Sequence, residues 1–433
     1  MKNAEKEILI SLKEGVDPRS VIHTNIGRSS HEMNSEMESK IQRLHSIKPI
    51  VKKAQVATAS TLESNLNDEK IFENEYKKMS ETEKKLYRTY KIKVGINENL
   101  EQILEELRNN KGVEHVQLNH MNKLLVKPND PRYGELYGLI NMQCEKAWEI
   151  SKGEDIVVAV IDSGVDYNHP DIKLNMWTDE NGKFGHDFSD KDDDPMDNDL
   201  HGTHVAGTIA AMGNNAIGVI GVAPKVKIMA IKVFPNATDA VIREAIKYAV
   251  DNGAKIINNS WGPTGQRPKN IELEKVIDYA YEKGVIVVFA AGNENDETKY
   301  YSPANYPKTI AVGAVDANDT KAYFSNYDEN VVVSAPGVEI LSLKAKTNDY
   351  IKERMSGTSM AAPHVSGLVA LLLSKKPNLK FNQIVKILKE STDDVQTDKY
   401  IGTGRVNAYK ALKHNLITDN ILAETDLVGA ANK

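Results

Sequence analysis

Cysteine is almost absent from this chain of 433 residues, which contains only Cys144. One cysteine cannot form an intrachain disulfide, so we expect the fold to be stabilised by burial of apolar side chains and by any bound metal. A lone cysteine is most often a small core residue, and Cys144 is therefore not a candidate nucleophile.

Long apolar segments are lacking as well. No stretch approaches the ~20 apolar residues of a membrane-spanning helix, and residues 1–15 are charged and contain no apolar signal segment. The sequence as numbered therefore predicts no membrane span, and it leaves the compartment undecided. The net charge of −6 provides no basic surface, so a nucleic-acid partner is not expected.

The N-terminal part, residues 1–126, is predicted to form a small α+β unit. Strands are expected at 7–12, 90–94 and 113–118. Apolar residues at helical spacing predict a helix at 100–110.

A polar insertion at about 24–83 interrupts this unit, with helical pieces expected at 36–44 and 69–79. The segment 127–131, Lys-Pro-Asn-Asp-Pro, is typical of a linker. Residues 1–127 contain 22 basic and 19 acidic residues, a net charge of +3. The remainder contains 33 and 42, a net charge of −9, and opposite charges favour docking of the two parts.

The second part, 127–415, alternates short runs rich in Val and Ile with helical stretches, and a polar tail follows at 416–433. This alternation predicts an α/β domain with a mostly parallel central sheet flanked by helices. We expect strands at 156–161, 227–233, 255–258, 285–290, 309–315 and 330–334, and helices at 203–212, 240–252 and 271–283.

Three motifs in this domain contain residues suited to catalysis. Ser359 lies in Gly-Thr-Ser-Met-Ala-Ala-Pro-His, before an apolar run that predicts a buried helix. A serine at a helix start is either an N-cap or a nucleophile next to free backbone N–H groups. Asp162 follows a buried strand, where it could cap a turn or partner a histidine.

The third motif is His-Gly-Thr-His at 201–204. Its two histidines could bind zinc, but the pattern lacks a third ligand and is a weak zinc signal. His201 could alternatively act as a general base near neutral pH, with Asp162 orienting its ring and Ser359 as nucleophile. The chain order Asp, His, Ser is one of the three known orders of a serine-protease triad.

With all three motifs in this order, residues 128–415 resemble the subtilisin-like serine proteases, the subtilases. The resemblance implies a catalytic triad of Asp162, His201 and Ser359, with Asn293 as the oxyanion-hole amide. It also implies that the N-terminal unit is an inhibitory prodomain, removed by cleavage near 121–127.

The resemblance further implies where a protein or peptide substrate binds. Its backbone would pair with the segment 260–262, and the facing wall of the primary pocket would be 290–292. These two segments comprise Ser260, Trp261, Gly262, Ala290, Ala291 and Gly292.

The chain departs from the family pattern around this pocket. Trp261 is larger than the usual residue, Tyr300 and Tyr301 fall near the pocket floor, and the segment 234–239 is short. Glu294 could lie at the rim and favour a basic substrate side chain, or be a solvated charge. We therefore expect a shallow or reshaped pocket.

Calcium is the cofactor that the resemblance implies. The matching ligands are the side chains of Asp171 and Asn215 with the carbonyls of Ile217 and Val219, and Asp130 would complete the shell. Such oxygen ligands suit calcium. An acidic cluster before His201 is either a solvated loop or a second calcium site; it comprises Asp187, Asp190, Asp192, Asp193, Asp194, Asp197 and Asp199.

These observations predict a serine endopeptidase made as a self-processing zymogen. Two alternatives are a processing protease dedicated to one partner protein and a catalytically silent peptide-binding homologue. The complete set of triad residues argues against the silent form.

Overall fold

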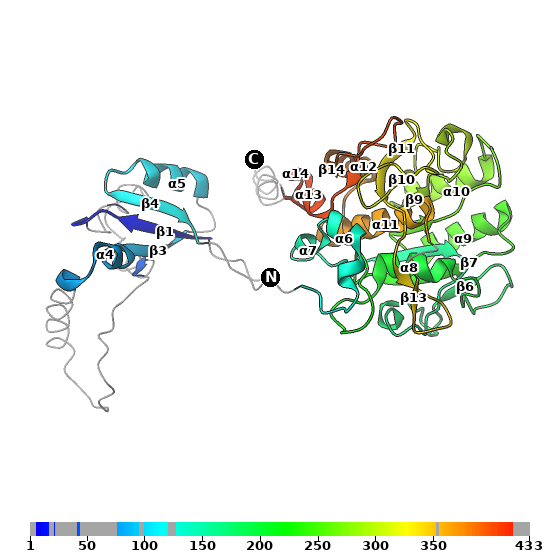
Figure 1. Ribbon diagram of the computed structural model, residues 1–433, viewed down its shortest axis with the longest axis horizontal. Coiled ribbons are helices and arrows are strands. Elements are labelled where there is room, and N and C mark those ends of the chain that lie inside the picture. Colours follow the sequence, from blue (N-terminus) through cyan, green and yellow to red (C-terminus); the bar gives the residue numbers. More distant parts are fainter. Residues whose placement is uncertain are drawn as a thin grey trace, which may run out of the picture. The chain divides into compact units, whose positions relative to one another are not determined.

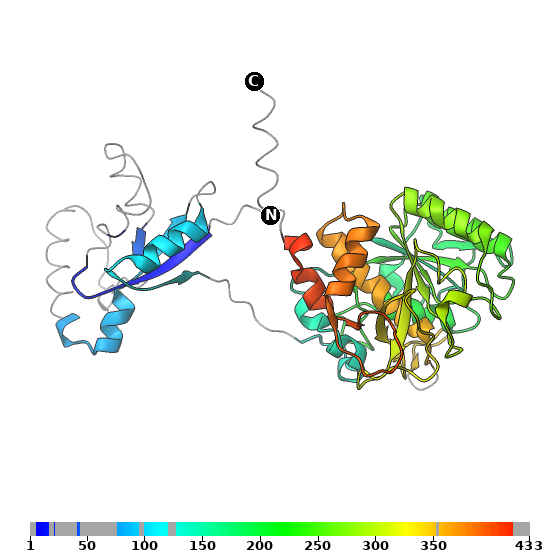
Figure 2. The same ribbon diagram turned by 90° about the horizontal axis from the view of Figure 1, so that it is seen from above.

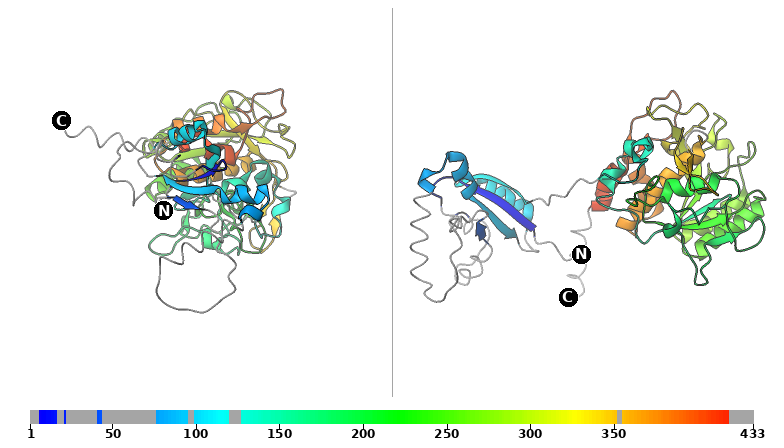
Figure 3. Two further views of the ribbon diagram at one scale, coloured as in Figure 1. Left: turned by 90° about the vertical axis from the view of Figure 1, so that its left-hand side faces the viewer. Right: turned by 60° about the horizontal axis from the view of Figure 1, so that its bottom comes forward.

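The computed structural model describes residues 6–16, 21, 41–43, 76–94, 99–119, 127–351 and 355–418 (Figure 1). The chain divides into two compact units, Met1–Leu125 and Val126–Lys433, and each is described by itself (Figure 3). Most of the insertion predicted at 24–83, the predicted cleavage segment up to residue 126 and the tail from 419 lie outside the described residues. No helix among the described residues is long and apolar enough to cross a membrane.

The N-terminal unit is an antiparallel sheet with one helix on it (Figure 2). Its strands lie in the order β2-β3-β1-β4. The sheet's apolar side chains and one face of helix α5 (Leu100–Asn109) form a separate hydrophobic core. The strands are β1 (Lys6–Leu12), β2 (Ile41–Arg43), β3 (Thr89–Val94) and β4 (Val113–Leu118).

Two details of this unit differ from the sequence prediction. The helix predicted at 36–44 is wrong at 41–43, because these residues form β2 and pair with β3. A helix that was not predicted, α4 (Glu81–Tyr87), follows the polar insertion. Its signal was present in the sequence: Ser80 and Glu83 form a reciprocal capping box at its start.

The second unit is built on a mostly parallel sheet, as predicted, and the strand order in its described part is β14-β15-β11-β10-β9-β8-β5-β7-β6. Only the β14–β15 pair in this sheet is antiparallel. The strands are β5 (Val157–Asp162), β6 (Gly185–Asp187), β7 (Lys227–Lys232), β8 (Ile256–Asn259), β9 (Ile286–Ala290), β10 (Ile310–Val315), β11 (Val331–Pro336), β14 (Thr392–Asp393) and β15 (Arg405–Val406). A separate hairpin consists of β12 (Ser342–Leu343) and β13 (Tyr350–Ile351).

Helices cover both faces of this sheet (Figure 1). Alternate residues of β5 show this: Val158 and Val160 join the core that includes α8 and α11, whereas Ala159 and Ile161 join the core that includes α9 and α10. The helices are α6 (Tyr137–Asn141), α7 (Cys144–Ala147), α8 (His201–Ala210), α9 (Asp239–Asp251), α10 (Ile271–Glu282), α11 (Thr358–Lys375), α12 (Phe381–Glu390), α13 (Ala408–Lys413) and α14 (Asn415–Thr418). Short 3-10 turns lie at Tyr133–Glu135, Lys173–Asn175 and Thr298–Tyr300.

This topology places the candidate residues at one edge of the sheet. The strands β9, β8 and β5 are neighbours and run parallel, so their carboxyl ends lie together. Asp162 ends β5, Ser260 follows β8 and Asn293 lies just beyond β9. An open α/β sheet binds its ligands at this edge. Cys144 is fully buried in the core, as predicted.

Candidate active site

The carboxylate of Asp162 meets the ring of His201, which opens α8. Asp162 Oδ1 lies 2.7 Å from His201 Nδ1 and accepts a second hydrogen bond, 2.8 Å long, from the backbone N–H of Ser163. Facing a carboxylate, Nδ1 carries the hydrogen, which leaves Nε2 free to accept a proton. The Asp162 side chain is 2% exposed and that of His201 is 28% exposed, so the base can be reached while its partner is shielded.

Two opposing effects act on the pKa of His201. Burial lowers it, but the charge of Asp162 and the hydrogen bond that His201 donates to Asp162 outweigh burial, with smaller contributions from Asp197 and Asp199. The net result is a pKa above the ordinary value of 6.5. The imidazolium that forms on accepting a proton is thus stabilised by the site.

A buried carboxylate that the sequence analysis did not assign to the site fixes the start of α8 relative to β5. Asp197 accepts hydrogen bonds from Ser163 Oγ (2.9 Å) and from the N–H (2.9 Å) and hydroxyl (2.6 Å) of Thr203. Ser163 Oγ in turn accepts from the N–H of Gly202, at 2.9 Å. A carboxylate at a helix N-terminus is favourable, and here it also holds the segments that carry Asp162 and His201 together.

The zinc alternative for His201 and His204 is wrong. His204 is fully buried, with Nε2 2.8 Å from the carbonyl of Ile340, and burial lowers its pKa to about 4. Its ring packs under the β12–β13 hairpin, so His204 is a core residue. Among the described residues, no three His, Cys, Asp or Glu side chains are arranged to hold a metal.

Ser359 lies in the first turn of α11, and its hydroxyl bonds to the segment after β8. Ser359 Oγ donates to the carbonyl of Ser260 at 2.9 Å, and Ser260 Oγ donates to the carbonyl of Ser359 at 2.8 Å. This reciprocal pair joins the helix start to the sheet edge. The two helices that carry Ser359 and His201 pack against each other.

The amide of Asn293 has a fixed orientation. Its Oδ1 accepts from the backbone N–H (2.8 Å) and the hydroxyl (2.9 Å) of Thr358, so its NH₂ group faces elsewhere. A Cβ on Gly357 would lie 3.4 Å from Asn293 Nδ2 and 3.6 Å from the backbone N of Ser359. The two nitrogens therefore border one small space, which a glycine at 357 keeps open.

A cavity of about 280 Å³ adjoins this space. Its walls include Ser359, Asn293 and most of the residues that the resemblance assigned to substrate binding. Ser260 lies beside the cavity without lining it, and of the two tyrosines expected at the floor only Tyr301 lines it. The lining residues are Trp261, Gly262, Pro263, Thr264, Ala290, Ala291, Gly292, Asn293, Glu294, Tyr301, Pro303, Ala304, Thr358 and Ser359.

Two polar side chains that line the cavity form hydrogen bonds with other residues of the protein. The indole N–H of Trp261 donates to the carbonyl of Ile161 at 3.0 Å, and the ring meets Phe289 edge-on. Glu294 Oε2 accepts from the N–H of Asn293 and from the amide of Asn326, both at 2.8 Å. One oxygen of the Glu294 carboxylate thus has protein partners, and the residue is exposed at the cavity wall.

Comparison with known proteins places the chain in a family. Residues 153–408 match the model of the subtilase family, a serine-peptidase family. The chain belongs to the subtilase family. It is 42% identical over 330 residues to the thermophilic serine proteinase of Bacillus sp. strain AK1, covering 75% of this chain and 78% of that protein. It is 40% identical over 292 residues to thermitase of Thermoactinomyces vulgaris, covering 66% of this chain and 99% of that protein.

A solved structure agrees with this assignment. A protease of Pseudoalteromonas arctica PAMC 21717 superposes with a TM-score of 0.62 at 31% identity, covering 66% of this chain and 99% of that one. The protein is thus a subtilisin-like serine endopeptidase, which acts on protein or peptide substrates.

The five residues expected to bind calcium lie together in this subtilase. Asn215 Nδ2 donates to Asp171 Oδ1 at 2.6 Å, and the N–H of Val219 donates to Asp171 Oδ2 at 3.0 Å. Asp130 Oδ2 accepts from the N–H of Asn214 at 3.0 Å. Burial raises the pKa of Asp130, and raises that of Asp171 to about 6.

This donor set fits a hard cation. The turn from 214 to 218 includes three residues with positive φ, Asn214, Ala216 and Gly218. Two buried carboxylates with raised pKa values lie next to an amide whose oxygen and nitrogen are exchangeable by a flip. Together with the backbone carbonyls of Ile217 and Val219 they offer the oxygen chemistry that calcium prefers.

The acidic cluster before His201 is divided among several partners. Asp187 and Asp190 bond to Lys232 Nζ at 2.6 and 3.0 Å, Asp193 pairs with Lys183, and Asp197 is bonded at the start of α8. In the described chain Asp187, Asp190 and Asp193 thus pair with lysines, whereas Asp190, Asp192, Asp193 and Asp194 are exposed.

Proposed function

We propose that Ser359 is the nucleophile, His201 the general base and Asp162 the residue that orients His201. The observation that carries this proposal is the 2.7 Å contact between Asp162 and His201 at the strand edge that Ser359 also borders. The Ser359 hydroxyl turns from the Ser260 carbonyl toward Nε2 of His201, passes its proton there and attacks the scissile carbonyl carbon. Contacts of this kind commonly tighten only when substrate is bound.

The oxyanion that forms on this attack would lie in the space beside Gly357. The amide of Asn293 and the backbone N–H of Ser359 would donate to it, which supports its charge in a site with fixed donors. His201 then passes the proton to the leaving amine, and a water molecule hydrolyses the acyl group by the same steps in reverse order.

The substrate side chain before the scissile bond would enter the 280 Å³ cavity. Its walls are mainly apolar, from Trp261, Ala290, Pro303 and Ala304. We therefore propose that the pocket takes an apolar side chain. The Glu294 carboxylate, whose hydrogen bonds come from uncharged amides and leave its charge in place, is the group there that would favour a basic one.

Calcium would be held by Asp130, Asp171, Asn215 and the carbonyls of Ile217 and Val219. When bound, it supplies only structural stabilisation, because the loop is distinct from the residues proposed for the chemistry. The N-terminal unit, with its own core, would act as the inhibitory prodomain that the resemblance implies, released by cleavage near 121–127.

The Ser359→Ala variant tests the triad proposal. We expect hydrolysis of a peptide substrate to fall by about 10⁶-fold, the loss found on removing the nucleophile of subtilisin. Mass spectrometry is expected to show an intact chain of 48.1 kDa for the variant and a separated N-terminal fragment for the parent. Ser374→Ala, near the far end of α11, is the matched control and is expected to behave as the parent.

Residual hydrolysis or processing by purified Ser359→Ala protein at the parental rate would contradict the proposal. Profiling the parent against a peptide library also addresses the dedicated processing protease: cleavage of many sequences with an apolar preference supports a general endopeptidase. Cleavage confined to one sequence would support the dedicated form.

A further inference from the structure

A fully buried asparagine, Asn326, lies behind the turn that carries Asn293. It belongs to the loop after β10 and has no exposed surface. Its amide donates to the carbonyl of Ala291 at 3.2 Å and to Glu294 Oε2 at 2.8 Å. Its Oδ1 accepts from the N–H groups of Glu294 and Asp296, both at 3.0 Å.

The backbone of Asn326 holds the same turn. Its N–H donates to the carbonyl of Gly292 at 3.0 Å, so the backbone of Asn326, like its side chain, is hydrogen-bonded to the turn 291–296. Gly292 has φ +111°, and a Cβ there would lie 2.2 Å from Asn326 Nδ2. The turn and the asparagine are therefore in direct contact, and a glycine is required between them.

Glu294 extends this contact to Asn293. The same carboxylate oxygen that accepts from Asn326 also accepts from the backbone N–H of Asn293, at 2.8 Å. On the other side, Thr358 holds Oδ1 of Asn293. Asn293 is thus held at its backbone through Glu294 and Asn326 and at its side chain by Thr358.

We propose that Asn326 is a positioning residue for oxyanion stabilisation, acting through Glu294 and the 291–296 turn on the amide of Asn293. The inference rests on the proposed role of Asn293 as oxyanion donor. Donors in such a site must be held within ~0.5 Å of the productive geometry, and a buried side chain with four hydrogen bonds to one turn can hold them so. Asn326 itself does not line the substrate cavity.

The chemistry of the site explains why an amide is needed at 326. Two of its contacts require a donor and two require an acceptor, and an amide of this size offers both. An aspartate would have the same shape but would face Glu294 Oε2 and the carbonyl of Ala291 with an acceptor. Asn326→Asp is therefore a matched test of the donor contacts.

The test is a double-mutant cycle with Asn326→Ala, Asn293→Ala and the double variant. For each, kcat and KM are measured on a chromogenic peptide substrate, together with the inhibition constant of a peptide boronic acid, whose adduct with serine mimics the oxyanion. Asn293→Ala is expected to lower kcat by about 10²–10³-fold, as in subtilisin. Asn326→Ala is expected to lower kcat by roughly 10–100-fold, with KM within about threefold of the parent, a smaller loss than for the donor itself.

If Asn326 acts through Asn293, adding Asn326→Ala to Asn293→Ala changes kcat by less than about threefold. Boronic-acid inhibition weakens in step with kcat/KM for the single variants. Asn407→Ala is the control: Asn407 is equally buried and bonds to Asp393 and Lys410, away from the cavity, so it is expected to lower stability but keep kcat.

The outcomes separate the two claims. If Asn293→Ala leaves kcat unchanged, the oxyanion role of Asn293 fails. If Asn293→Ala is slow but Asn326→Ala multiplies that loss fully in the double variant, the inference about Asn326 fails while the role of Asn293 stands. Should Asn326→Ala not fold, Asn326→Asp is measured in its place: lowered kcat with retained KM supports the inference, and parental kcat overturns it.

Discussion

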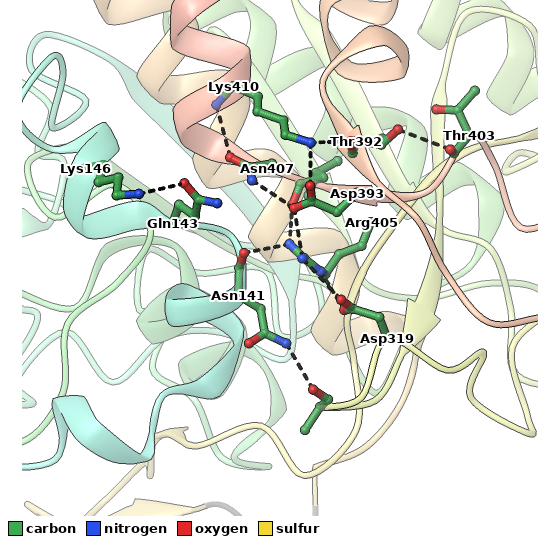
Figure 4. A network of polar contacts seen from close by, with 12 residues as sticks. Asn141, Gln143, Lys146, Asp319, Thr392, Asp393, Thr403, Arg405, Asn407 and Lys410 are labelled. Atoms are coloured by element: carbon green, nitrogen blue, oxygen red, sulfur yellow. Dashed lines mark hydrogen bonds and ion pairs between the residues drawn. The ribbon is translucent and has the colours of Figure 1, made fainter.

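Two parts of the second unit pair a carboxylate with a basic side chain, and they differ in what the pairing can do. At the proposed active site, Asp162 holds His201 through one hydrogen bond. At the other, Arg405 of β15 lies between Asp319 and Asp393 and also reaches the carbonyl of Asn141 (Figure 4). All five N–H groups of its guanidinium have acceptors.

The difference lies in the base and in its exposure. Arg405 is 5% exposed and remains charged at every ordinary pH, so its network can only be structural. His201 is 28% exposed and changes its charge near neutral pH, so the same kind of pairing can move a proton. The guanidinium of Arg405 stabilises the fold because all of its N–H donors are bonded. A histidine that acts as a base needs one ring nitrogen that is free to accept a proton.

Replacing Asp162 by asparagine is expected to have the largest effect on the activity of the enzyme. Without the carboxylate the tautomer of His201 is no longer fixed, and kcat should fall by about 10⁴-fold, as in other serine proteases. Catalysis needs neutral His201, and its raised pKa places the acid limb of kcat/KM above pH 6.5. Because the variant loses the attraction that raises this pKa, its acid limb should shift to lower pH.

The measurement is kcat/KM from pH 5 to 9 for the parent and the variant. The position of the acid limb separates an electrostatic role of Asp162 from a purely steric one. An acid limb in Asp162→Asn that coincides with the parental one would show that Asp162 does not set the pKa of His201.

Arg405→Met should give the reverse result, with lost stability and retained chemistry. Removing the buried guanidinium leaves Asp319 without its cation and Asp393 with Lys410 alone, and we expect it to cost about 3 kcal/mol in the free energy of unfolding, the lower end for breaking a buried ion pair. Urea unfolding measures this loss. The control is Arg267→Met, whose ion pair with Asp239 is over a third exposed and should contribute about 0–1 kcal/mol.

The kcat of folded Arg405→Met protein, measured at low temperature, should equal that of the parent. A large loss of kcat without a loss of stability would contradict the division between structural and catalytic charge.

The same contrast explains what could be predicted from the sequence. Asp162, His201 and Ser359 were identifiable because each lies in a local motif at a strand end or helix start, and the parallel strand order brings them to one edge. The roles of Asp197 and Asn326 were not predicted because they arise from contacts with Ser163 and Ala291, 34 and 35 residues away, which no local pattern encodes. The Arg405 network is still less local, since it joins residues 141, 319 and 393.

Asp130 and Asp171 are a third group of buried carboxylates, and among the described residues neither pairs with a basic side chain. If calcium supplies the missing positive charge, the midpoint temperature of unfolding should rise when calcium is added. At a calcium concentration of 100 times the Kd, the free energy of unfolding should increase by about 2.7 kcal/mol. Asp171→Asn should remove this response. Asp194→Asn, at an exposed carboxylate of the acidic cluster, is the control and should keep it. An unfolding midpoint in the parent that is independent of calcium, before and after chelation, would contradict the site.

Tyr301→Ala should have the smallest effect, because it alters the shape of the pocket and no charge of the triad. The Tyr301 side chain is almost fully buried at the cavity wall, and its hydroxyl donates to Asp296 at 3.0 Å. Removing the ring enlarges a pocket of about 280 Å³, so kcat/KM for peptides with a large aromatic side chain before the cut should rise relative to alanine peptides. One methylene group of added contact corresponds to about 1–3 kcal/mol, or roughly 10–200-fold in selectivity. The ratio of kcat/KM for matched phenylalanine and alanine peptides measures this change, and Tyr300→Ala, at a residue that does not line the cavity, should leave the ratio as in the parent. An unchanged ratio in Tyr301→Ala would place the limit on side-chain size at another wall of the pocket.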